Sequence, residues 1–285
     1  MPLNLITLTA VKGRRTSNVR IIQAALITAL LMVSTQVRSQ YMEVGVFVGD
    51  SYYIGDLNPN LPFKQAQLAY GIIGRYNLDA RWTVKLSASR GTVKGNGKDK
   101  DFETGKGLSF ESPITDVSAT VEFNFLNYFT GSRGEIISPY LYGGIGFFFF
   151  DPKSGSTSLR SLGTEGQNIG YEGRSPYSTT GLNFPFGLGV KFSLGRRFCI
   201  SAFWEMHKTF TDYIDDVSTT YYLNGSLINP TDQAGNYSDP TRNHKPGMER
   251  GNSRTKDWYS FSGAALTYKF DIRGKKRCKD RPYHK

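Results

Sequence analysis

The chain of 285 residues lacks any apolar run long enough to cross a bilayer as a helix. Its longest mainly apolar segment, Ile21 to Val33, has 13 residues, whereas a membrane-spanning helix needs about 20. Only two cysteines and three histidines are present. Cys199 and Cys278 show neither zinc-binding spacing nor a disulfide framework, and so few histidines leave little choice of an imidazole base for catalysis.

Acidic residues are absent before Glu43, although the same stretch is basic. Arg14, Arg15 and Arg20 precede the apolar segment, and Ser39 belongs to a short group of residues suited to a cleavage point. A basic region followed by a short apolar core is typical of a secretory signal peptide. We therefore predict a signal peptide over 1–39 and a mature chain that works outside the cytoplasm; a buried helix or a membrane anchor is the alternative.

The formal net charge of +11 is concentrated at the two ends of the chain. Residues 1–39 contain five basic residues and no acidic one, and residues 271–285 contain seven basic and two acidic ones. The region between them is nearly neutral, which gives no support for nucleic-acid binding. We predict a basic periplasmic tail over 271–285 that docks an acidic partner, with a solvated disordered end as the alternative. Its candidate partner-binding residues are Cys278, Lys275, Lys276, Arg277 and Lys279.

Apolar and polar residues alternate along most of the chain after residue 40. In TGLNFPFGLGVKFSL, Thr180 to Leu194, one face is apolar throughout, as expected for a strand. Most of these segments exceed the usual strand of about 5 to 6 residues and approach what a tilted strand needs to cross a bilayer. The sequence predicts eight such strands, at 42–49, 68–77, 81–92, 116–129, 138–150, 180–194, 197–214 and 257–270.

Connections between these segments alternate between long and short. Aromatic residues such as Trp82, Tyr128 and Tyr268 fall near the predicted strand ends, where interfacial girdles belong. A soluble sandwich would also alternate, but an even strand count with short turns on one side favours a closed membrane barrel. We predict an all-β fold over 40–270: an eight-stranded antiparallel transmembrane β-barrel in the outer membrane, with short periplasmic turns and long extracellular loops.

An eight-stranded barrel has a narrow interior that side chains fill. Strand parity places charged residues of both signs there, which predicts a plug of ion pairs and hydrogen bonds instead of a large pore. The predicted lumen network comprises Glu43, Arg75, Lys85, Glu122, Lys191, Glu205 and His207.

Three carboxylates in KTFTDYIDDVSTTYY, Lys208 to Tyr222, are the strongest local candidates for chemistry. Asp212, Asp215 and Asp216 lack the spacing and glycine of a calcium loop, so we expect them to mark a strand leaving the membrane. Calcium in the loop 215–256 stays open as an alternative. No serine accompanies a histidine in the strand pattern, and we predict neither enzymatic activity nor a cofactor.

Six strings resemble, in order, a family of Bacteroidetes outer-membrane barrels, the PorG-like component of the type IX secretion system. The strings are GVFVGDSYYIGDLNP (45–59), SPYLYGGIGFFFFDPKS (138–154), LGTEGQ (162–167), PFGLGVKFSL (185–194), KTFTDYIDDVSTTYY (208–222) and RGNSRTKDWYSFSGAALTYKF (250–270). The resemblance spans about 45–270. It implies a non-enzymatic outer-membrane subunit that associates with a periplasmic ring of a PorK-like lipoprotein and a PorN-like protein. That assembly exports folded cargo, including proteases and gliding adhesins.

Two other functions remain open from the residues alone. The long loops 151–179 and 215–256 could make the barrel a surface adhesin or a membrane stabiliser. Because some eight-stranded barrels modify lipids, an enzyme that uses His207 is the third hypothesis.

Overall fold

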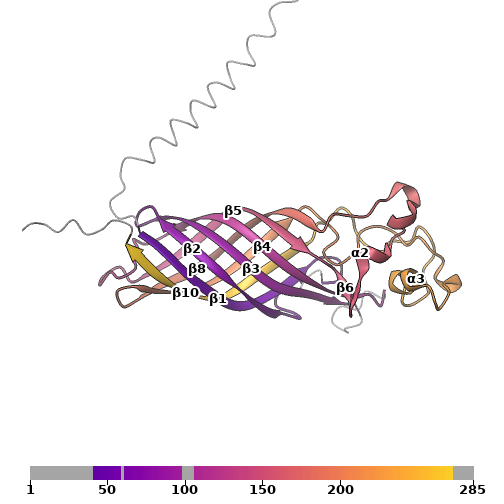
Figure 1. Ribbon diagram of the computed structural model, residues 1–285, viewed down its shortest axis with the longest axis horizontal. Helices are drawn as coiled ribbons and strands as arrows, with labels where there is room; N and C mark the ends of the chain where they lie inside the picture. The colour runs from indigo at the N-terminus through magenta and orange to yellow at the C-terminus, as the bar shows by residue number, and fades with distance from the viewer. Residues whose placement is uncertain (1–40, 59–60, 98–105, 272–285) are drawn as a thin grey trace, which may run out of the picture. The chain divides into compact units, whose positions relative to one another are not determined.

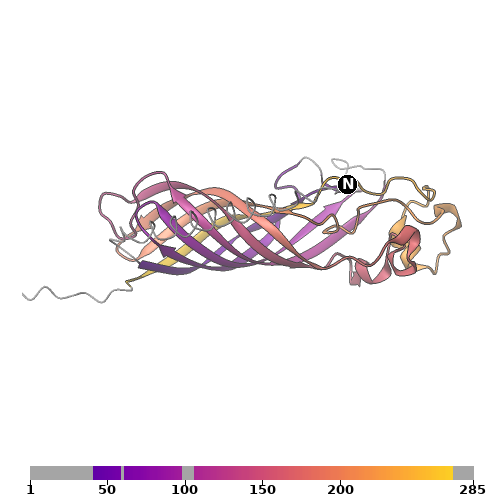
Figure 2. The same cartoon turned by 90° about the horizontal axis from the view of Figure 1, so that it is seen from above.

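Eight long antiparallel strands form a closed barrel in the computed structural model, which describes residues 41–58, 61–97 and 106–271 (Figure 1). Figures 1 and 2 show these strands running obliquely around the barrel. The barrel strands are β1 (Tyr41–Ile54), β2 (Gln67–Asn77), β3 (Trp82–Asn96), β4 (Ser109–Asn124), β5 (Ile137–Phe150), β8 (Thr180–Leu194), β9 (Phe198–Thr209) and β10 (Trp258–Asp271).

Closure of the barrel comes from pairing between the first and last strands. β1 pairs with β2 along one edge and with β10 along the other, where Tyr41 faces Asp271. β3 pairs with β4, so each barrel strand has two neighbours and no edge is left open. Backbone groups in hydrocarbon need such partners, because lipid offers them no hydrogen bonds.

The outer face of the barrel is apolar, and the inner face is largely polar. On β8 the side chains of Leu182, Phe184 and Leu188 are 62, 47 and 57% exposed, whereas Asn183 and Lys191 are buried. A soluble protein would bury the apolar face instead. This inverted arrangement on a closed barrel is the form that lipid requires, and it identifies the chain as an outer-membrane β-barrel.

The two shortest connections, 78–81 and 195–197, and the two longest, 151–179 and 210–257, occupy opposite ends of the barrel. The connections 78–81, 125–136 and 195–197 lie at the end that holds Tyr41 and Asp271, which the usual topology makes periplasmic. Several strands differ from the predicted bounds: β1 continues to Ile54, β3 continues to Asn96, and β4 starts at Ser109 rather than at 116. Beyond Asp50 alternation fails as a guide, because Tyr52 and Tyr53 are both fully buried.

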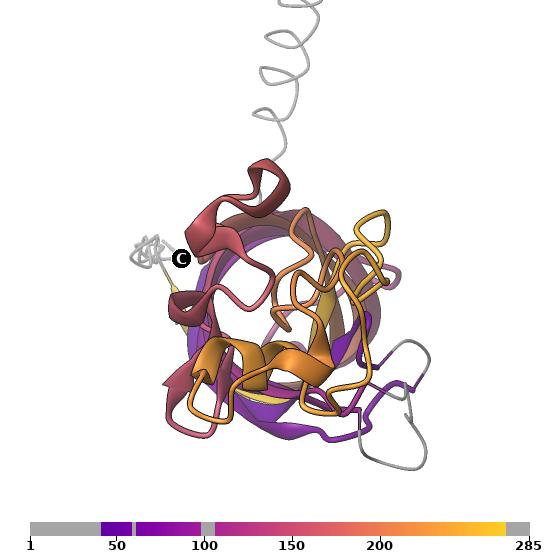
Figure 3. The ribbon, with the colours of Figure 1, turned by 90° about the vertical axis from the view of Figure 1, so that its right-hand side faces the viewer.

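External loops fold over the mouth of the barrel, as Figure 3 shows. The loop after β5 contains a small hairpin, β6 (Lys153–Ser154) and β7 (Thr157–Ser158), then α2 (Leu159–Leu162) and two 3-10 turns, η2 (Gln167–Ile169) and η3 (Tyr171–Gly173). The loop after β9 contains η4 (Gly225–Leu227) and α3 (Gln233–Ser238). Among the described residues, no helix is long and apolar enough to cross a membrane.

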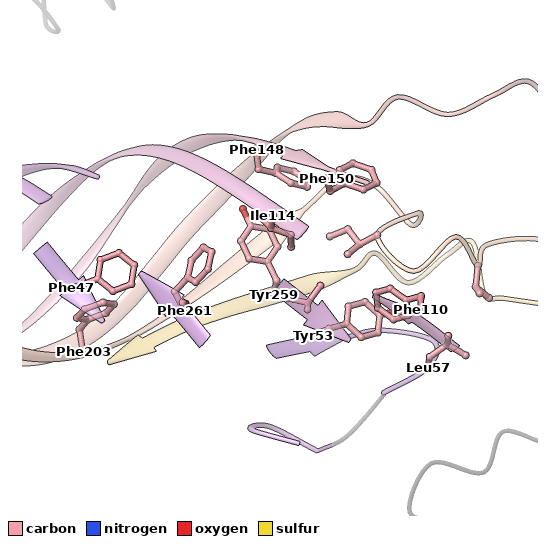
Figure 4. Close-up of a cluster of buried hydrophobic side chains, with 14 of the residues drawn as sticks. Phe47, Tyr53, Leu57, Phe110, Ile114, Phe148, Phe150, Phe203, Tyr259 and Phe261 are labelled. Atoms are coloured by element: carbon pink, nitrogen blue, oxygen red, sulfur yellow. The ribbon is translucent and has the colours of Figure 1, made fainter. Parts of the chain in front are cut away.

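Aromatic side chains fill the barrel interior toward its external end. Figure 4 shows Phe47, Phe203 and Phe261 close together, with Tyr259 and Phe148 further along. The Phe47 and Phe203 rings meet edge to face at 5.4 Å, and the Phe148 and Tyr259 rings lie 5.3 Å apart. These residues form one buried cluster that continues beneath the external loops.

Candidate functional site

The structure places all seven predicted lumen residues inside the barrel, and all are buried. At their centre, Glu122 lies between two cations: Arg75 Nε is 3.2 Å from its Oε1, and Lys191 Nζ is 2.6 Å from its Oε2. Arg75 also approaches Glu43 Oε2 at 3.7 Å and donates a hydrogen bond to Ser201. This group links β1, β2, β4 and β8 across the narrow interior.

A second group of lumen charges lies next to the first. Lys85 Nζ is 2.6 Å from Glu205 Oε2, while His207 Nε2 is 3.0 Å from Glu205 Oε1. On its other side, the His207 ring faces Asp116, whose Oδ2 accepts a hydrogen bond of 2.8 Å from Tyr259. Together the two groups join charges of both signs from one wall to the other, so paired side chains occupy the lumen at this level.

Asp116, Asn183 and Tyr259 also belong to this network, and they were not predicted from the sequence. Asn183 donates to Asp116 Oδ2 at 2.6 Å, and Tyr259 stacks on the His207 ring with centroids 4.4 Å apart. They occupy inward-facing positions in the alternation of their strands, and this pattern could have identified them. The predicted lumen residues were all charged residues or histidine, which left out Asn183 and Tyr259, and Asp116 stood at the start of its predicted strand.

A catalytic arrangement is not formed around His207. Within the described part of the chain its partners are Glu205, Asp116, Asn183 and aromatic rings, without a serine or other nucleophile. The whole group is sealed from solvent. The arrangement pairs buried charges, and removing one partner of such a pair strongly destabilises the folded protein.

The external loops 151–179 and 215–256, which we together call the cap, are joined by a second buried cluster. It contains Arg250, Glu165 and Asp216, with less than 2% of each side chain exposed. Arg250 Nη1 lies 3.0 Å from Glu165 Oε1, and its Nη2 lies 3.6 Å from Asp216 Oδ2. Glu165 also accepts hydrogen bonds from the backbone N–H groups of Ser218 and Thr219. This cluster therefore ties the loop after β5 to the loop after β9.

Tyr53 anchors the cap to the barrel wall. Its hydroxyl lies 2.5 Å from Asp215 Oδ2 and 2.9 Å from Asp257 Oδ1. One phenolic hydrogen cannot serve both carboxylates, so close approach of both requires a proton on one of them. Burial, followed by the charge of the other group, raises the pKa of Asp215 well above its usual range, and burial also raises that of Asp257.

The three carboxylates of KTFTDYIDDVSTTYY are buried in the cap and do not simply mark an exit from lipid. β9 ends at Thr209, so Asp212, Asp215 and Asp216 all lie in the loop, with 3% or less of each residue exposed. Burial raises the pKa of Asp212 to about 7 and that of Asp216 to about 6. The three aspartates do follow the end of a strand, as expected, but the external loops bury them at that point.

No group of three or more histidine, cysteine, aspartate or glutamate side chains in the described ranges is arranged to hold a metal ion. Cys199 is a free, buried cysteine on β9. The predicted signal peptide, 1–39, and the tail residues Cys278, Lys275, Lys276, Arg277 and Lys279 lie outside the described residues.

Solved structures with a similar barrel share little sequence with this chain. Ail, the attachment invasion locus protein of Yersinia pestis, has a TM-score of 0.40 at 12% identity, covering 81% of this chain and 99% of that one. Neisserial surface protein A has a TM-score of 0.43 at 9% identity, covering 80 and 97%. The outer-membrane enzyme PagL has a TM-score of 0.27 at 13% identity, covering 82 and 100%. At these scores, the fold assignment depends on the strand pairing of this chain.

No curated protein matches the sequence. A family model described as a domain of unknown function, DUF6089, matches residues 22–279, which is most of the chain.

Proposed function

This chain belongs to the DUF6089 family, and we propose that it is an outer-membrane component of the type IX secretion system. In this role the barrel anchors the periplasmic ring of a PorK-like lipoprotein and a PorN-like protein for the export of folded cargo. The six strings that resemble PorG-like barrels support this proposal.

The filled lumen is the observation that carries the proposal. Glu122, Arg75 and Lys191 are each 99% or more buried, and Glu122 pairs with both cations across the interior. Folded cargo cannot pass through an eight-stranded barrel, and a small solute would have to break buried ion pairs. Such a barrel acts through its surfaces, as an anchor does.

The periplasmic rim offers a surface of the required charge. Arg81, Arg133, Arg196 and Arg197 are exposed in the three periplasmic connections 78–81, 125–136 and 195–197. Neither Arg133 nor Arg196 has a side-chain partner among the described residues, so both guanidinium groups are free to meet an acidic protein surface. The basic tail 271–285 follows β10 at this same end and would add to the positive charge.

The experiment compares charge reversals at the two ends of the barrel. We expect Arg133→Glu/Arg196→Glu to reduce recovery of the ring proteins when the tagged barrel is purified from detergent-solubilised envelopes, and to lower cargo secretion. The matched control, Lys245→Glu/Arg254→Glu, reverses two exposed charges on the external loops and should leave both unchanged. Equal recovery from both variants and from a chain truncated after Asp271 would refute anchoring through this rim and tail.

A second candidate, a surface adhesin, is favoured by the exposed apolar tips of the cap. Ile169 and Leu227 are 71 and 79% exposed on loops that buried ion pairs hold in place. We expect Ile169→Ser/Leu227→Ser to reduce attachment of cells to a surface, with secretion intact, if the cap is an adhesin. Unchanged attachment would remove this candidate.

A further inference from the structure

A groove of about 370 Å³ lies on the lipid-facing side of β1, β2 and β3. Val46, Ile72 and Tyr70 line it with side chains that are 59, 62 and 53% exposed, so it opens toward the membrane. Ala88 faces Ile72 on one side and Val117 on the other in the strand register. The short Ala88 side chain between two branched ones leaves room for a chain of methylene groups.

Arg90 stands at one end of this groove, close to the external boundary of the membrane. It lies eight residues beyond Trp82, which is exposed at the periplasmic end of β3. A tilted strand crosses the hydrocarbon in about 9 to 11 residues, so Arg90 falls near the outer interface. Tyr70, its neighbour in the register, is an aromatic residue of the type found at this level.

The charge of Arg90 is not neutralised by the described part of the protein. Its guanidinium donates one hydrogen bond, to Thr115 Oγ1 at 3.3 Å, and no described carboxylate forms an ion pair with it. Lys94, four residues along the same strand, is instead paired with Glu111 at 2.9 Å. An unpaired cation on a lipid-facing surface calls for an anion from the membrane itself.

We propose that Arg90 and the groove bind a phosphorylated glycolipid of the outer leaflet, of the lipid A class. The guanidinium holds a phosphate, which it can contact through two N–H groups, and the groove formed by Val46, Ile72 and Ala88 takes one acyl chain. A phosphate complements the positive charge of Arg90. Because Arg90 lies near the external interface, the phosphate belongs to a lipid of the outer leaflet, which holds this glycolipid. The site is independent of the periplasmic rim proposed above.

The test uses the full-length barrel, delipidated in detergent, with purified lipid A added and counted as bound adducts by native mass spectrometry. Arg90→Gln should raise the dissociation constant about tenfold, as expected for loss of a charged hydrogen-bonding group. Ala88→Leu, which fills the groove, should weaken binding while leaving the charge in place. Lys94→Gln is the matched control and should bind as the wild type does. Retention of the heat-dependent gel shift shows that each variant is folded.

Two further probes separate phosphate from lipid binding in general. Dephosphorylated lipid A should bind the wild-type barrel as weakly as intact lipid A binds Arg90→Gln. Equal affinity of the wild type and both groove variants for lipid A would overturn the site. Tighter binding of phosphatidylethanolamine than of lipid A would overturn the assignment to the glycolipid.

Discussion

Replacing Arg250 with methionine should open the cap while leaving the barrel intact. The Arg250 guanidinium is fully buried, pairs with Glu165 and Asp216, and donates to the carbonyl oxygens of Ser238 and Asp216. Methionine fills part of the volume but leaves two buried carboxylates without their cation. Breaking a buried pair in this way costs about 3 to 5 kcal/mol, which corresponds to a roughly hundredfold or greater increase in the open population.

Limited proteolysis of the purified barrel measures that population, because cleavage within loops 151–179 and 215–256 requires the cap to open. The matched control is Arg254→Met, since Arg254 is exposed in the same loop and its side chain has no partner in the described ranges. We expect cap cleavage to rise at least tenfold in Arg250→Met and to stay near the wild-type rate in Arg254→Met. Equal cleavage of the two variants would refute the account of the cap as a structure held by buried charge.

Three further predictions concern the cap, the lumen and the strand packing. Burial raises the pKa of Asp216 to about 6 and that of Asp212 to about 7, so the closed cap binds more protons than the open one between about pH 4 and 7. The stability of the cap, measured by hydrogen exchange, should therefore fall as the pH rises through this window, by up to about 3 kcal/mol for Asp216. Asp212→Asn should make this pH dependence weaker. Glu122→Leu leaves two buried cations without their carboxylate and should lower the barrel's free energy of unfolding, measured in urea, by about 3 to 5 kcal/mol. Glu111→Gln, on the same strand, breaks an exposed pair and should lower it by less than about 1 kcal/mol. Similar urea midpoints for the two variants would contradict this. Gly144→Ala should impair barrel assembly, since a Cβ there would lie 2.0 Å from the Ala119 carbonyl oxygen, while Gly143→Ala, with nothing closer than 3.8 Å, should assemble normally in a gel-shift assay.

Alternation along the strands predicted the barrel because each strand separates two unlike surroundings. Leu182 and Leu188 face lipid, and Lys191 faces the lumen. Successive side chains of a strand point to opposite sides, so the alternation of apolar and polar residues matches the alternation of lipid and lumen. That correspondence ends where both faces are covered. Tyr53 is buried beneath the external loops beside Asp215, whereas Tyr52, on the other face of β1, is covered by Phe63. Because both faces are covered, the extension of β1 to Ile54 could not be predicted from polarity.

Long-range partners in the cap could not be derived from local pattern. Glu165 and Arg250 are 85 positions apart in two loops that read as polar connections. Three of the six strings that resemble PorG-like barrels meet in this cluster: LGTEGQ contains Glu165, KTFTDYIDDVSTTYY contains Asp216, and RGNSRTKDWYSFSGAALTYKF begins at Arg250. The packing of the loops therefore gives a physical role to strings that the sequence alone marked only as points of resemblance.

Site-specific photocrosslinking in intact cells tests the central claim, anchoring through the periplasmic rim, most directly. A photoreactive amino acid at Arg133, in the periplasmic connection 125–136, should give adducts that contain the PorK-like or PorN-like ring protein. The same amino acid at Arg254, exposed at the external end, should give none. Absence of a ring adduct from position 133 when the barrel and the ring are both present, or equal adducts from both positions, would contradict the proposed function.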